Sequence, residues 1–189
     1  MIKIIKNCLV YAPEPLGEKD IVIIADRFGF ITNPSDRPRT DGFPTEVIDA
    51  GGRYAFPGFV DGHVHITGGG GEGGFHTRTP EIALSSLVKG GITSVIGCLG
   101  TDGISRSLES LYAKAKALTE EGLSAYMLTG SYRVPIVTLT GDPMKDIMLI
   151  DLVVGAGEIA LSDHRSAQPS LEAVRSLAGA IRVGGILSG

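Results

Sequence analysis

The pattern of the chain changes at the stretch Phe56-Pro57-Gly58-Phe59-Val60-Asp61-Gly62-His63-Val64-His65. Before it, residues 1–55 form short apolar segments rich in Val, Ile, Phe and Tyr, separated by turn residues and without helical periodicity. After it, residues 56–189 alternate between strand, loop and helix patterns. We therefore predict a small β domain over residues 1–55 and an α/β domain over residues 56–189.

The α/β domain is predicted to contain strands at residues 59–66, 93–99, 125–128 and 159–161. Helices are predicted to begin at Thr79, as N-cap before Pro80, and to cover residues 108–118, 146–154 and 171–181. This alternation implies a parallel sheet of βαβ units. A doubly wound sheet also fits the count, but its glycine fingerprint is missing and polar residues follow the strand ends, as in a (β/α)₈ barrel.

Composition bounds the class of protein. The 189 residues are 43% hydrophobic with a net charge of −4 and carry no basic run, which argues against binding to nucleic acid or an anionic membrane. No apolar stretch reaches the ~18 residues of a membrane span, and the N-terminus does not resemble a secretory signal. Cys8 and Cys98 lie in apolar segments and are predicted to be buried free thiols, so we expect a soluble cytoplasmic protein.

The pair His63-Val64-His65 predicts a metal site. Side chains at positions i and i+2 of a strand point to the same face, here into the mouth of the predicted barrel. Two neutral imidazoles so placed can bind one divalent metal, most commonly Zn²⁺. Two unrelated histidines at a strand end would give the same pattern, but Asp61 before the pair and the glycine run after it favour the metal.

Several motifs together resemble the amidohydrolase superfamily and, within it, the isoaspartyl (β-aspartyl) dipeptidase family. They are residues 56–65, Gly68-Gly69-Gly70-Gly71-Glu72-Gly73-Gly74, Thr77-Arg78-Thr79-Pro80-Glu81, Leu99-Gly100-Thr101-Asp102, Thr129-Gly130-Ser131-Tyr132 and Ser162-Asp163-His164-Arg165-Ser166. The resemblance implies a (β/α)₈ TIM barrel of the amidohydrolase type with a small N-terminal β-sandwich domain. Because residues 63–189 are about half of the ~250 that a barrel needs, we expect only its first four βα units, in a truncated or split chain.

The resemblance also implies an activity. It is hydrolysis of the isopeptide bond in β-aspartyl dipeptides by a metal-bridging hydroxide, in a cytoplasmic homo-oligomer with two zinc ions per complete site. His63 and His65 would bind metal, and Glu72 would hold the substrate ammonium, with Gly70 and Thr101 lining that end. Tyr132 would donate a hydrogen bond to the developing oxyanion, and Arg165 would pair with a substrate carboxylate.

The chain departs from the family at the bridging ligand. The usual member carries a carbamylated lysine at the end of the fourth strand, but no lysine follows Lys145 here. Alignment on residues 162–165 puts Glu158 at that position. A glutamate supplies a bridging carboxylate without CO₂, although its carboxyl carbon lies closer to the backbone. We therefore predict that Glu158 bridges the metals and that glycines at 155 and 157 let the backbone move inward.

Alternatives stay open at each position. Glu72 could be solvated, Tyr132 could be packing, Arg165 could form a surface ion pair, and Thr101 could be a helix cap. His76 and His164 match no ligand role and are expected to be peripheral. For the whole chain, the alternatives are a cyclic-amide hydrolase, such as a dihydroorotase or hydantoinase, or a non-catalytic half-barrel. The remaining ligands and a proton-shuttle aspartate are expected beyond residue 189, so the chain alone is expected to be inactive.

Overall fold

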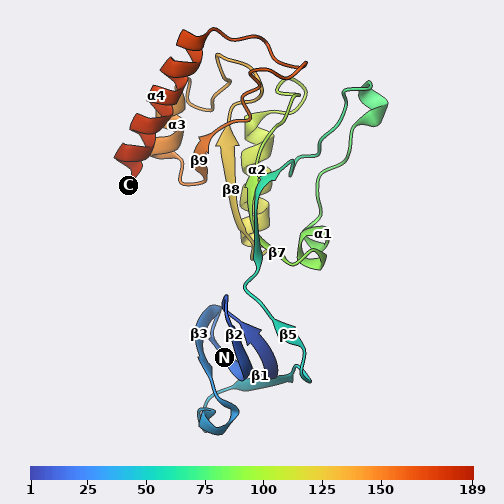
Figure 1. Cartoon of the computed structure of the whole chain (residues 1–189), viewed down its shortest axis with the longest axis vertical. Coiled ribbons are helices and arrows are strands. Elements are labelled where there is room, and N and C mark those ends of the chain that lie inside the picture. Colours follow the sequence, from blue (N-terminus) through green and yellow to red (C-terminus); the bar gives the residue numbers. More distant parts are fainter. The chain divides into compact units, whose positions relative to one another are not determined.

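The computed structural model describes residues 1–189, which divide into two compact units, Met1–Pro57 and Gly58–Gly189 (Figure 1). The strands of the first unit all belong to one sheet, and the main strands of the second unit to another. No helix combines the length and the apolar character that crossing a membrane requires.

The first unit is a five-stranded sheet in the order β3-β2-β1-β4, with β5 also paired to β1. Its strands are β1 Ile2–Tyr11, β2 Pro15–Ile24, β3 Arg27–Thr32, β4 Thr45–Asp49 and β5 Tyr54–Ala55, and a 3₁₀ turn, η1, covers Pro34–Asp36. Antiparallel pairs join β1 to β2 and β2 to β3, whereas β4 and β5 run parallel to β1.

The sheet of the first unit has a small core. Ile4, Cys8, Val10 and Val22 are buried, consistent with the alternation of side chains along strands. Residues 1–57 form one sheet and contain no second sheet to pack against it, so the β-sandwich stays a prediction.

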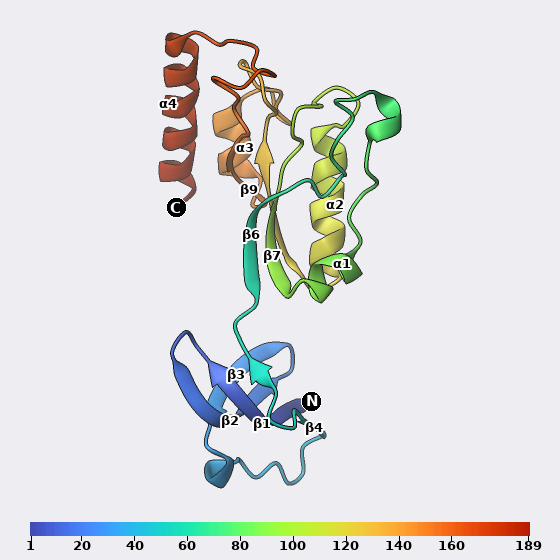
Figure 2. The same ribbon diagram turned by 45° about the vertical axis from the view of Figure 1, so that its right-hand side comes forward.

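The second unit contains a parallel sheet in the order β6-β7-β8-β9, formed by Phe59–Val64, Ile92–Gly97, Ser124–Thr129 and Val153–Ala156. Its helices are α1 Leu84–Lys89, α2 Leu108–Glu120, α3 Pro143–Leu149 and α4 Leu171–Ser188 (Figure 2), and a 3₁₀ turn, η2, covers Phe75–Thr77. Each strand is separated from the next by one helix along the chain, so all four carboxyl ends lie at one edge of the sheet.

Helix α2 shows why this unit folds. Leu108, Leu111, Ala115 and Leu118 recur at helical spacing and are buried in the core against the sheet. Each buried leucine stabilises the fold by about 1.5–3 kcal/mol relative to an exposed one. Ser107 caps the helix by accepting a hydrogen bond from the Ser110 N–H.

The start of the first helix differs from the prediction. Helix α1 begins at Leu84 after Ala83, and Thr79 is not its N-cap. The reason is that Thr79 is engaged elsewhere. Its N–H donates to the Gly69 carbonyl at 2.9 Å, and its hydroxyl accepts from the Gly69 N–H at 2.7 Å. These bonds tie residue 79 to the glycine-rich segment instead of to a helix.

The third helix and fourth strand were also misplaced. Helix α3 starts after the N-cap Asp142, whose side chain accepts from the Met144 N–H, and it ends at Leu149. Strand β9 then covers Val153–Ala156, where the sequence analysis had predicted the end of the helix, and residues 159–161 lie in a loop. Residues 147–154 are almost continuously apolar, and such a run does not separate a helix end from a buried strand by periodicity.

Candidate active site

The predicted metal ligands come from two strand ends. His63 lies on β6 and His65 directly follows that strand, while Glu158 lies two residues beyond the end of β9. The Nε2 atoms of His63 and His65 each lie 3.0 Å from Glu158 Oε1. The two imidazole rings are stacked, with centroids 5.5 Å apart and planes inclined by 12°. Strand alternation therefore places both imidazoles on one side, opposite the carboxylate.

Glu158 Oε1 is buried and makes no hydrogen bond, although two ring nitrogens lie 3.0 Å away, because their geometry does not satisfy one. A buried carboxylate oxygen without a partner is costly unless something else satisfies it. Burial raises the pKa of Glu158, but interactions with His65, Cys98 and Tyr132 outweigh it and lower the pKa to about 2. An ionised carboxylate facing two imidazoles is a donor set that fits a divalent cation such as Zn²⁺.

A fourth donor lies in the same cluster. One ligand atom from each of His63, His65, Cys98 and Glu158 lies within 4.8 Å of all the others. Cys98 is free and fully buried, as the sequence analysis predicted, and burial raises the pKa of its thiol. Its place in this cluster was missed. The available signal was its position directly after β7, the strand that pairs with β6.

The opposite end of the site is a charged pair. Glu72 Oε1 accepts hydrogen bonds from Arg165 Nη1 at 2.7 Å and from Thr101 Oγ1 at 2.9 Å. Arg165 also donates to both carboxylate oxygens of Asp163, at 2.7 and 3.0 Å. The hydrogen bonds from Arg165 and then Thr101 lower the pKa of Glu72, so its carboxylate is ionised at neutral pH.

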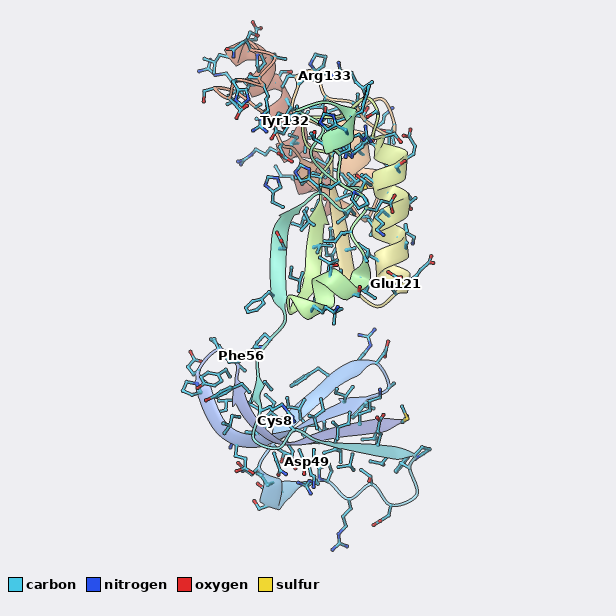
Figure 3. All side chains as sticks on the ribbon, turned by 90° about the vertical axis from the view of Figure 1, so that its right-hand side faces the viewer. Cys8, Asp49, Phe56, Glu121, Tyr132 and Arg133 are labelled. Atoms are coloured by element: carbon cyan, nitrogen blue, oxygen red, sulfur yellow. The ribbon has the colours of Figure 1, made fainter.

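Tyr132 lies beside this charged end. The guanidinium carbon of Arg165 lies 5.0 Å from the centre of the Tyr132 ring, a cation–π distance. Figure 3 shows Tyr132 and Glu121 at opposite ends of the second unit, with Tyr132 at the end where the strands finish. Burial raises the pKa of the Tyr132 hydroxyl, so it stays protonated and can donate a hydrogen bond.

The glycine-rich segment that carries Glu72 is held from beneath by a residue that the sequence analysis missed. Arg106 is almost fully buried, and its Nη2 donates to the Gly69 carbonyl at 2.7 Å. Its Nε and Nη1 donate more weakly, each at 3.4 Å, to the Thr67 and Gly70 carbonyls. Gly70 has φ +68°, and a Cβ there would lie 2.5 Å from the Thr77 carbonyl oxygen. Position 70 therefore requires glycine, and the hydrogen bonds from Arg106 hold this segment in place at the side of the site.

These groups share one cavity of about 340 Å³. Its lining includes every residue to which the sequence analysis gave a site role: His63, His65, Gly70, Glu72, Thr101, Tyr132, Glu158 and Arg165. His76 and His164 do not line it, and the His164 side chain is 83% exposed. The cavity therefore combines a donor cluster at one end with a carboxylate–guanidinium pair at the other.

Comparison with known proteins also indicates a hydrolase of the amidohydrolase kind. A model of the Amidohydrolase family matches residues 46–122. A β-aspartyl dipeptidase structure from Fervidobacterium islandicum AW-1 is 55% identical over the whole chain with a TM-score of 0.95, and a complex of that enzyme with β-Asp-Leu superimposes with a TM-score of 0.91. A dihydroorotase from Staphylococcus aureus (strain Mu50 / ATCC 700699) is 32% identical over 119 residues, 63% of this chain.

The chain spans about half the length of the solved dipeptidase structures, 51% and 49%, and 26% of the dihydroorotase. The similarity to the dipeptidase structures nevertheless extends over all 189 residues, and the family match covers the His63–His65 strand. The predicted resemblance is confirmed, and the fold is the mixed α/β TIM-barrel fold of that group. Residues 46–122 match the Amidohydrolase family, and the whole chain is similar to the β-aspartyl dipeptidase structures.

Proposed function

We propose that this chain carries part of the active site of a metal-dependent hydrolase that cleaves the isopeptide bond of β-aspartyl dipeptides. The observation that carries the proposal is the pairing, in one cavity, of the His63–His65–Glu158 cluster with the Glu72–Arg165 pair. The 55% identity to an enzyme solved with β-Asp-Leu supports this substrate class. We also propose that residues 58–189 supply the first four βα units of a TIM barrel.

At the metal end, His63, His65 and Glu158 would hold zinc, with Glu158 as a bridging carboxylate between two ions. Bound zinc supplies a water of lowered pKa, near 7, and polarises the scissile carbonyl. The buried, unpartnered oxygen of Glu158 supports this role, because a cation would satisfy it where no hydrogen bond does. The chain's own contribution here is to fix the position of the ions at the edge of the sheet.

At the charged end, Glu72 would bind the α-ammonium of the β-aspartyl residue, with Gly70 and Thr101 lining this end, and Arg165 would bind a substrate carboxylate. Glu72 and Arg165 now satisfy each other at 2.7 Å. A dipeptide that carries both an ammonium and a carboxylate can replace each partner of this pair, so neither charge is left alone. A ligand that carries only a carboxylate would leave Glu72 with the Thr101 hydroxyl alone, which disfavours its binding, whereas Arg165 keeps Asp163 as a partner in either case.

Between the two ends, Tyr132 would donate a hydrogen bond to the oxygen of the scissile carbonyl as negative charge develops on it. Its raised pKa keeps the donor proton in place at neutral pH. Arg165, over the ring, holds the tyrosine at the boundary between the charged end and the metal end. The residues of the chain thus orient the dipeptide and stabilise the developing charge.

The proposal is tested with the zinc-loaded product of the intact gene and with β-Asp-Leu, monitoring release of free aspartate and leucine. The expected result is hydrolysis of β-Asp-Leu and no hydrolysis of α-Asp-Leu, whose scissile amide and ammonium have a different spacing. Equal hydrolysis of both peptides, or of neither, contradicts the proposal.

We also propose that the protein forms a homo-oligomer. The mass of the protein in solution tests this proposal.

One alternative has specific support, namely a cyclic-amide hydrolase, because the dihydroorotase is 32% identical over 119 residues. The cyclic substrate of such an enzyme has no free ammonium for Glu72 to bind. Turnover of dihydroorotate but not of β-Asp-Leu by the same preparation would favour this alternative. The Glu72–Thr101 and Glu72–Arg165 contacts favour the dipeptide.

A further inference from the structure

The Cys98 side chain lies behind the cavity lining, beside His63, His65 and Glu158, and has no role in the function proposed above. It directly follows β7, its side chain is fully buried, and its sulfur belongs to the cluster with His63, His65 and Glu158 in which all ligand atoms lie within 4.8 Å. The sulfur's hydrogen bond, to the Val64 carbonyl at 3.7 Å, is long and weak. A donor atom therefore lies beside the cluster with little else to bind.

The alternation of β7 explains why this side chain reaches the cluster. A Cβ on the preceding residue, Gly97, would meet Ile66 and Leu111, so that position faces the hydrophobic core. A Cβ on Gly100 would lie 2.2 Å from His65 Cε1, so position 100 faces the imidazole. Cys98 lies between them on the side of His65 and Glu158, where Gly100 leaves room for the ring.

We propose that Cys98 Sγ is a direct ligand of the metal centre, which then has a His–His–Cys–Glu donor set. The inference rests on the metal centre of the proposed function. On binding, the S–H bond breaks, a sulfur–metal bond forms and the proton passes to solvent. The metal keeps its oxidation state, so no redox partner is needed.

A sulfur ligand determines which metals this centre selects. Thiolate is a soft donor that favours Zn²⁺, Co²⁺ and Cd²⁺, whereas Mg²⁺ and Mn²⁺ favour oxygen donors. A centre made of two imidazoles and a carboxylate alone would discriminate less strongly. We therefore expect tight Cd²⁺ and Zn²⁺ binding that depends on residue 98 and weak Mn²⁺ binding that does not.

Two measurements on the product of the intact gene, the same preparation that tests the proposed function, test the assignment. Titration with Co²⁺ should produce a thiolate-to-metal charge-transfer band in the near ultraviolet. The band should disappear in Cys98→Ser and persist in Cys8→Ser, because Cys8 lies in the core of the first unit. In Cys98→Ser, the affinity for Cd²⁺ should fall at least about 10-fold while that for Mn²⁺ stays unchanged.

X-ray absorption at the zinc edge of the unmodified protein tests the same assignment without a variant, so the result does not depend on whether Cys98→Ser folds. The expected result is a sulfur scatterer at about 2.3 Å beside nitrogen and oxygen scatterers at about 2.0–2.1 Å. Zinc bound with nitrogen and oxygen scatterers alone overturns the role of Cys98 and leaves the metal centre intact. Failure to bind any divalent metal overturns both the ligand assignment and the metal centre of the proposed function.

Discussion

The two ends of the cavity are built on opposite principles. At the metal end, the side chains of Glu158, His65 and His63 are 17%, 32% and 60% exposed, and the buried carboxylate oxygen that faces both histidines has no hydrogen bond. At the charged end, Glu72 is half exposed, and it is paired with Arg165 and bonded to Thr101. One end has donor atoms without a partner, and the other has charges that already satisfy each other.

This difference indicates how each end is completed. Buried lone pairs without a partner require a cation from outside the chain, so the metal end depends on an added ion for its stability. The Glu72–Arg165 pair is partly exposed to solvent, and such a pair contributes little to folding and can open at small cost. The charged end therefore suits a ligand that comes and goes, whereas the metal end suits an ion that stays. Variants at the two ends should separate metal binding from substrate binding.

The largest effect is expected at the metal end. Glu158→Gln keeps the shape of the side chain but removes the negative charge, and we expect metal affinity to fall by more than about 100-fold, beyond the range for residues that only support a ligand. Competition with a chromophoric chelator measures this loss. Glu120→Gln, at the end of α2, is the matched control and should bind metal normally. Full metal affinity in Glu158→Gln would remove Glu158 from the site.

The next effect is expected between the two ends. Tyr132→Phe removes one donor to the developing oxyanion, and we expect kcat for β-Asp-Leu to fall by about 100-fold or more with little change in KM. Tyr126→Phe is the control, because Tyr126 lies on the same strand, β8, and does not line the cavity. A rise in KM at unchanged kcat would show that Tyr132 only shapes the pocket.

The sequence predicted the two histidines of the metal end through a local rule and the other site residues through resemblance. His63 and His65 follow from strand alternation alone, a property of two residues and their backbone. Glu158 came from alignment of the motif at 162–165, and the strand predicted beside it was misplaced, since β9 ends at Ala156. The position of Glu158 was nevertheless predicted correctly, because it was counted from the motif at 162–165 and not from the end of the strand.

The residues that were missed depend on contacts distant in the sequence. Arg106 bonds carbonyl groups more than 30 positions away, and no local pattern marks an arginine as a partner for backbone oxygens. Cys98 was predicted to be buried, but its neighbours come from β6 and from the loop after β9. Apolar periodicity predicts which side chains are inside; it does not give the polar groups that they face.

A smaller effect than that of Tyr132 is expected at the charged end. Glu72→Gln removes a charge-assisted hydrogen bond worth about 1.5–3 kcal/mol, so KM for β-Asp-Leu should rise about 10- to 100-fold while metal affinity stays the same. Because the pKa of Glu72 is lowered, its carboxylate stays ionised above its ordinary value of about 4.3, and this group should add no pH dependence to KM between pH 5 and 8. Steady-state kinetics at several pH values measures both.

The matched substrate for that variant is the succinyl analogue of β-Asp-Leu, which lacks only the α-ammonium. The unmodified protein should handle this analogue as poorly as Glu72→Gln handles the dipeptide, and the variant should lose little further with it. An equal additional loss with the analogue would mean that Glu72 does not bind the ammonium.

The smallest effect is expected from Thr101→Val, which keeps the side-chain shape and removes the hydroxyl that donates to Glu72 at 2.9 Å. The helix-cap alternative for Thr101 does not hold, because Ser107 caps α2. Loss of one hydrogen bond of about 0.5–1.5 kcal/mol should raise KM for β-Asp-Leu by about 2- to 10-fold. In Glu72→Gln the same change should have a much smaller effect, since the carboxylate it orients is gone. Additive effects in the double variant would show that Thr101 contacts the substrate directly, and the charged end would then recognise the ammonium with two independent groups.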